Sequence, residues 1–181
     1  CSMELGGNAP FLVFDDADVD AAIEGAMISK FRNGGQTCVC TNRFYVQDGV
    51  YDEFVTKLAA RVSAMKIGYA MDAGTQVGPL IDIKAVEKVE EHLADAVAGG
   101  ATVLAGGKRS PLGHSYFEPT VISGVTPDMK LAKEETFGPL AGVIRFTKEE
   151  DAIRMANDTE FGLASYFYAR DISRVWRVGE A

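Results

Sequence analysis

The stretch PFLVFDDADVDAAIEGAMISKFRNGGQTCVC, residues 10–40, determines which fold the chain can adopt. It opens with an apolar run, residues 10–14, that has the length of a buried strand. Aspartates then offer helix N-caps, and apolar residues recur at helical spacing up to Phe31. Gly34 and Gly35 end this helix, and Cys38 follows at once. The stretch therefore predicts a strand, a crossover helix and a loop that carries a thiol.

The same alternation continues along the rest of the chain. Further strands are predicted at residues 43–47, 101–105, 117–123, 140–146 and 165–169, and helices at 51–65, 82–98, 149–157 and from Asp171 onward. Strands that alternate with helices imply crossover connections and a largely parallel sheet covered on both faces. We expect one three-layer α/β/α domain over residues 1–181.

Composition and charge exclude several classes of partner. The net charge of −8 and the pI near 4.8 argue against binding to nucleic acid or to anionic membranes. No apolar run approaches the roughly 20 residues that cross a bilayer, so no membrane partner is expected. No zinc or phosphate-loop spacing appears, so no metal is expected. Three cysteines without framework spacing fit the reducing cytoplasm.

The two ends of the chain predict a piece of a longer protein. Cys1 is not a natural start and begins no signal peptide, and the chain ends at Ala181 while the pattern is still helical.

Cys38 is the strongest candidate for chemistry. A free thiol has a pKa of about 8.5, so a nucleophile needs help from backbone N–H groups, a helix end or a cation such as Arg32. The alternative is a small buried apolar side chain. For the cysteine taken alone the two interpretations are balanced. The preceding Gly-Gly-Gln-Thr sequence, whose glycines do little to shield the thiol, favours the nucleophile.

Three runs together resemble the aldehyde dehydrogenase family: residues 4–8 (ELGGN), residues 35–38 (GQTC) and residues 134–139 (EETFGP). The flanking residues, Phe31-Arg32-Asn33 before the second run and Val39-Cys40 after it, are similar to the succinate-semialdehyde branch of that family. The resemblance implies the fold of the family's catalytic domain.

The resemblance also implies roles for individual residues. Cys38 would attack the aldehyde carbon, and the thiohemiacetal would pass hydride to NAD or NADP and become a thioester. Glu4 would activate the water that hydrolyses the thioester. On the cofactor side, Glu135 would hold the ribose hydroxyls, Phe137 would pack near the nicotinamide, and Leu5 and Gly6 would contact the cofactor.

Arg32 and Cys40 remain open to two interpretations each. Arg32 either binds the distal carboxylate of a semialdehyde, succinate or alternatively glutarate semialdehyde, or only stabilises a helix C-terminus. Cys40 either forms a strained, reducible disulfide with Cys38 or only packs.

The resemblance places residues 1–181 in a catalytic domain truncated at both ends. The dinucleotide-binding domain would precede residue 1, the full-length protein would be a homo-oligomer, and the piece alone would be inactive or nearly so. Two other functions stay open. A thiol hydrolase or acyltransferase would need a histidine beside Cys38, with only His92 and His114 available, and both look structural or solvent-facing. A non-catalytic module would use the same loops for packing.

Overall fold

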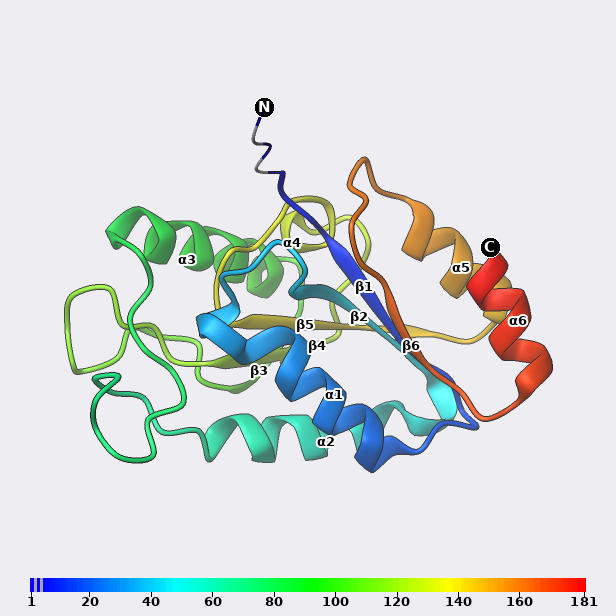
Figure 1. Cartoon of the computed structure of the whole chain (residues 1–181), viewed down its shortest axis with the longest axis horizontal. Helices are drawn as coiled ribbons and strands as arrows, with labels where there is room; N and C mark the ends of the chain where they lie inside the picture. Colours follow the sequence, from blue (N-terminus) through cyan, green and yellow to red (C-terminus); the bar gives the residue numbers. More distant parts are fainter. Residues whose placement is uncertain (2, 4) are drawn as a thin grey trace.

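A central, largely parallel sheet organises the chain (Figure 1). The structure is a computed structural model and describes Cys1, Met3 and residues 5–181. The described residues form six strands in the order β3-β4-β5-β2-β1-β6, and only β3 runs antiparallel to its neighbour. The strands are β1 Ala9–Val13, β2 Thr41–Gln47, β3 Thr102–Ala105, β4 Thr120–Ser123, β5 Leu140–Phe146 and β6 Tyr166–Tyr168. The predicted largely parallel sheet is confirmed.

Helices cover both faces of this sheet (Figure 1). They are α1 Val19–Phe31, α2 Asp48–Ser63, α3 Ile83–Ala98, α4 Lys130–Lys133, α5 Glu149–Asn157 and α6 Ile172–Glu180, with a short 3-10 turn, η1, at Arg32–Gly35. Residues of α1 and α2 pack on one face, and residues of α3, α4, α5 and α6 pack on the other. The predicted three-layer α/β/α architecture is therefore confirmed.

Both faces of β1 are buried, which explains why its sequence is apolar throughout. Phe11 and Val13 pack toward α1 and α2, while Leu12 and the following Phe14 pack toward the opposite layer. The Phe11 ring lies 5.2 Å from the ring of Phe44 on β2. Burying each such side chain contributes roughly 1.5–3 kcal/mol, so this central strand pair carries much of the core.

Some element boundaries differ from those predicted. β2 begins at Thr41 and α2 at Asp48, earlier than the predicted residues 43 and 51. The apolar spacing of Val86, Val89, Leu93 and Val97 predicts that all four lie on the inner face of α3, but Val97 is 47% exposed and Ala96 faces the core in the last turn. His92, expected to be structural or solvent-facing, is fully buried, because it pairs with polar groups beneath the helix.

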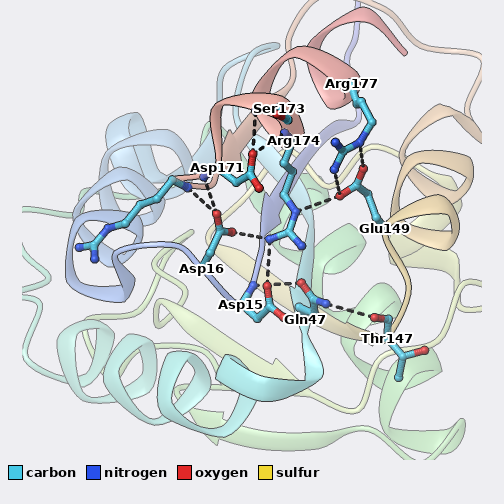
Figure 2. Close-up of polar contacts among 10 residues, drawn as sticks. Asp15, Asp16, Gln47, Thr147, Glu149, Asp171, Ser173, Arg174 and Arg177 are labelled. Atoms are coloured by element: carbon cyan, nitrogen blue, oxygen red, sulfur yellow. Dashed lines mark hydrogen bonds and ion pairs between the residues drawn. The ribbon is translucent and has the colours of Figure 1, made fainter.

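An ionic cluster holds α6 against the carboxyl end of β1 (Figure 2). The Arg174 guanidinium pairs with Asp15 at 2.9 Å, with Asp16 at 2.5 Å and with Glu149, at the start of α5, at 2.9 Å. It also lies over the Phe14 ring, 4.9 Å from the ring centre. Only 18% of the Arg174 side chain is exposed, so these pairs are shielded from solvent.

Gln47 ties the same edge together from β2. The backbone N–H of Asp15 donates to its Oε1 at 3.0 Å, and its Nε2 donates to the carbonyl of Thr147, just after β5, at 3.2 Å. The carboxyl ends of three adjacent strands are thus joined by polar contacts (Figure 2).

We expect Arg174→Met to lower the free energy of unfolding by about 1–3 kcal/mol, because it keeps the apolar stem but removes the shared cation from Asp15, Asp16 and Glu149. Chemical denaturation followed by circular dichroism measures this. Arg154→Met is the matched control: Arg154 pairs with Asp151 in an exposed contact, and its loss is expected to cost under about 0.5 kcal/mol. Equal effects of the two variants would contradict the role of the cluster.

The cluster also predicts a pH dependence. Hydrogen bonds from Arg177 and Arg174 lower the pKa of Glu149 against the effect of burial. For Asp16, burial alone would raise the pKa, but the backbone N–H groups of Asp171 and Arg170 and the Arg174 side chain lower it. Carboxylates with lowered pKa stabilise the fold above their unfolded pKa of about 4 and lose that contribution as pH falls. The difference between wild type and Arg174→Met should therefore shrink between about pH 5 and pH 2.

Candidate functional site

The candidate site lies at the amino ends of β1, β2 and β5. Gly7 leads into β1, Cys38 into β2 and Gly138 into β5. These strands are parallel and adjacent, with β2 in the middle. Segments that are far apart in the sequence therefore meet at one edge of the sheet, with the thiol segment between the other two.

An open cleft of about 470 Å³ lies where these segments meet. Its lining residues are Leu5, Gly6, Gln36, Thr37, Cys38, Glu135 and Phe137. The structure thus brings together Cys38 and the four residues expected on the cofactor side. Glu4 lies outside the described residues.

The turn before Cys38 depends on backbone conformations that suit glycine. Within η1, φ is +50° at Asn33, +63° at Gly34 and +77° at Gly35, so the chain reverses direction. A Cβ atom at Gly35 would lie 2.2 Å from the carbonyl oxygen of Gly138. The turn therefore packs directly on the segment that leads into β5, and a side chain at this position would separate them.

The loop that carries Cys38 is fixed on both sides. The Gln36 amide accepts a hydrogen bond from the backbone N–H of Ile81 at 2.9 Å, and the Tyr166 hydroxyl donates to the carbonyl of Val39 at 2.8 Å. These contacts come from outside the loop, one from the segment before α3 and one from β6. Cys38 is therefore presented by a held loop, as a positioned nucleophile requires.

The two neighbouring thiols differ in accessibility. Cys38 is half-buried and lines the cleft, whereas Cys40 is 1% exposed. The Cys40 sulfur lies 2.8 Å from the Thr37 hydroxyl, and the backbone N–H of Cys40 donates to the Thr37 carbonyl at 2.9 Å. All three cysteines are free thiols. Cys38 is thus the thiol that a small molecule in the cleft would meet first.

Glu135 is held across the cleft by the backbone of Gly7. The N–H of Gly7 donates to Glu135 Oε1 at 2.9 Å. A Cβ at Gly6 would lie 2.6 Å from Glu135 Oε2, and a Cβ at Gly7 would lie 2.1 Å from the carbonyl oxygen of Cys38. Both glycines are therefore needed for the carboxylate and the thiol loop to approach each other. Phe137, 42% exposed, stands in the same cleft.

Lys30 is a buried cation beneath the site that sequence reasoning missed. It is fully buried, and its ammonium donates to Asn42 Oδ1 at 3.0 Å. The Asn42 amide in turn donates to the carbonyl of Gly7 at 3.3 Å. Burial lowers the pKa of Lys30 to about 8, although Cys40 and Glu135 act to raise it. A lysine in the last turn of a helix is ordinarily solvated, so the sequence held no signal for this placement.

Arg32 and the histidines lie apart from the cleft. Arg32 is exposed at the start of η1 and is not a lining residue. Among the described residues, neither His92 nor His114 lines the cleft, and the two ring nitrogens of His92 contact Thr136 and Glu134 instead. The histidine partner that a thiol hydrolase needs is therefore not beside Cys38 in the described part of the chain.

Residues 5–181, with Cys1 and Met3, contain neither a metal-ligating cluster nor a membrane-spanning helix. No three His, Cys, Asp or Glu side chains gather there in a way that could hold a metal ion. Within the same residues, no helix combines the length and the apolar character needed to span a membrane.

Several known proteins are similar to this chain in sequence and in structure. The chain is 65% identical over 179 residues to a glutarate-semialdehyde dehydrogenase of Pseudomonas aeruginosa, with 99% of the chain and 37% of the relative covered. It is 63% identical over 179 residues to a 3-sulfolactaldehyde dehydrogenase of Pseudomonas putida, with the same coverage. The crystal structure of a succinate-semialdehyde dehydrogenase from Burkholderia pseudomallei superposes with a TM-score of 0.97 at 65% identity, over 99% of this chain and 37% of that one.

The chain thus spans little more than a third of the length of these relatives. The family model described as "Aldehyde dehydrogenase family" matches residues 1–181. With its fold and its thiol-lined cleft, the chain belongs to the aldehyde dehydrogenase family.

Proposed function

We propose that the full-length protein oxidises succinate semialdehyde to succinate with NAD or NADP, glutarate semialdehyde being the alternative substrate. The observation that carries this proposal is the cleft in which Cys38 faces Glu135 and Phe137. Family membership supports the reaction class. Residues 1–181 would be the thiol-bearing catalytic domain, and a dinucleotide-binding domain would lie outside this chain.

The names of the relatives support an anionic substrate. Glutarate semialdehyde, succinate semialdehyde and 3-sulfolactaldehyde all carry an acid group distant from the aldehyde. A chain with a net charge of −8 needs a local cation to bind such a group. Arg32, exposed six positions before Cys38, is our candidate, because a guanidinium binds carboxylate and sulfonate oxygens with two parallel hydrogen bonds.

In the proposed reaction the Cys38 thiolate attacks the aldehyde carbon. The backbone N–H of Cys38 donates to the oxyanion that forms, and the fixed loop keeps that donor in place. After oxidation, the thioester on Cys38 is hydrolysed by water that Glu4 deprotonates. The backbone at Gly7, three residues further along the chain, lies against the Cys38 carbonyl.

The cofactor side of the cleft fits part of a nicotinamide nucleotide. Glu135 uses one carboxylate oxygen for Gly7, which leaves the second for ribose hydroxyls. The exposed Phe137 ring offers an apolar surface, and Leu5 and Gly6 line the same cleft beside Glu135. NAD or NADP, when bound, supplies the hydride acceptor.

Three free thiols support the cytoplasm as the compartment, because disulfides are rare there. Assembly as a homo-oligomer, and inactivity of residues 1–181 alone, are further parts of the proposal.

A thiol hydrolase or acyltransferase is the less favoured function, since His92 is engaged elsewhere. A non-catalytic module is disfavoured by the open cleft at Cys38.

Cys38→Ala in the full-length enzyme should abolish NAD(P)-dependent oxidation of succinate semialdehyde, because no thioester forms without the thiol. Nucleotide reduction followed by absorbance measures turnover. Cys1→Ala makes the same chemical change at an exposed position outside the cleft and should keep activity. Retained turnover in Cys38→Ala would rule out the assignment.

Arg32→Ala should raise KM for succinate semialdehyde roughly 10- to 100-fold, the loss expected for a charge-assisted contact. KM for an uncharged aldehyde of similar length is the internal control and should change little. An equal loss with both aldehydes would mean that Arg32 supports the loop rather than the carboxylate.

Cys38 and Cys40 are also proposed to form a reversible disulfide. Hydrogen peroxide would take two electrons and two protons from the thiols, giving the disulfide and two water molecules. Peroxide should then inactivate the enzyme, dithiothreitol should restore it, and mass spectrometry should find the two thiols linked. In Cys40→Ser the linkage should be absent and recovery by dithiothreitol should fall. Full recovery in this variant would leave Cys40 with a packing role only.

A further inference from the structure

Thr136 lies between the two cleft residues Glu135 and Phe137, but its own side chain is only 2% exposed. Thr136 is buried between the more accessible Glu135 and Phe137, and its hydroxyl contacts the buried His92 ring, so the threonine points away from the cleft into the protein. A contact that fixes Thr136 therefore also fixes the orientation of Glu135 and Phe137 in the cleft.

His92 of α3 contacts the residues on either side of Glu135. Its Nδ1 lies 2.7 Å from the Thr136 hydroxyl, and its Nε2 lies 3.3 Å from Glu134 Oε2. The ring is fully buried. A single side chain from the core helix thus holds the loop at both flanks of the cleft carboxylate.

The partners of the ring fix where its protons are. Hydrogen bonds from Lys88 and His92 lower the pKa of Glu134, so its carboxylate accepts and His92 Nε2–H donates. Nδ1 of the neutral ring is then the acceptor for the Thr136 hydroxyl. Burial, and after it the Lys88 cation, lower the pKa of His92, which favours this neutral form.

The helix beneath the loop is a rigid support. A Cβ at Gly138 would lie 2.4 Å from Val89 Cγ2, so the end of the loop rests directly on α3. Val86 and Val89 are themselves fully buried, and Lys88 adds an ion pair to Glu134. Through His92, the loop that carries Glu135 and Phe137 is fixed relative to α3.

We propose that His92 is a positioning residue for cofactor binding: by holding Thr136, with Glu134 fixing which ring nitrogen accepts, it sets the placement of Glu135 and Phe137 opposite Cys38. The inference rests on the proposed function, in which those two residues face the nicotinamide nucleotide. His92 acts through Thr136 and does not itself line the cleft.

Three substitutions in the full-length enzyme separate the two hydrogen bonds. His92→Asn places an acceptor near the Nδ1 position and keeps the Thr136 bond, His92→Gln places a donor near the Nε2 position and keeps the Glu134 bond, and His92→Leu keeps neither. NAD and NADP are each titrated alone by protein fluorescence, and steady-state kinetics give KM for nucleotide and for succinate semialdehyde.

We expect His92→Leu and His92→Gln to raise Kd and KM for the nucleotide about tenfold, while KM for the aldehyde stays within about twofold. His92→Asn should restore nucleotide binding. Thr136→Val removes the same bond from the loop side, so combining it with His92→Leu should add no further loss.

Val86→Ala is the control for simple destabilisation, since it alters the buried face of the same helix without touching the loop hydrogen bonds. At an equal fall in Tm it should leave nucleotide Kd unchanged. An unchanged Kd in His92→Leu, an equal rise in Val86→Ala, or rescue by Gln rather than Asn overturns the inference and leaves the proposed function standing. A wild-type enzyme that binds neither nucleotide overturns both.

Discussion

The parallel pairing of β5, β2 and β1 is the constraint on which the rest of the molecule depends. Because these neighbours run in one direction, every segment that enters them arrives at one edge of the sheet and every segment that leaves them departs from the other. The thiol loop enters the middle strand, so it lies between the Gly6–Gly7 segment and the Glu135 loop. An antiparallel β2 would place Cys38 at the opposite edge from its partners.

The two edges of the sheet are built differently. Open α/β sheets commonly bind ligands at the carboxyl ends of their strands, but here that edge is filled by Arg174, its carboxylates and Gln47 (Figure 2). The amino edge is assembled from close backbone approaches at Gly7 and Gly35 and stays open as a cleft. Charge pairing thus closes one edge, while at the other edge these glycines let the segments pack closely around an open cleft.

Local periodicity predicted the layers and the alternation of strands and helices along the chain. The family resemblance singled out five of the residues that line the cleft, Leu5, Gly6, Cys38, Glu135 and Phe137, but not Gln36 and Thr37. Neither could predict contacts that depend on tertiary placement. Lys30 looks like an ordinary helix-surface residue, and the sequence leaves His92 either structural or solvent-facing. Both are buried and bonded to groups that hold the cleft. The prediction that Val97 faces the core was wrong for a related reason. Apolar spacing along a helix does not reveal which residue faces the core in the last turn.

The position of β1 in the sheet has a consequence for synthesis of the protein. On one side β1 pairs with β2, which follows within the next few tens of residues, but on its other side it pairs with β6, which ends at Tyr168. While the intervening chain is being made, that side of β1 presents unpaired backbone groups along an apolar strand. Such an edge pairs readily with other chains, so the nascent protein is most exposed to aggregation before β6 emerges from the ribosome.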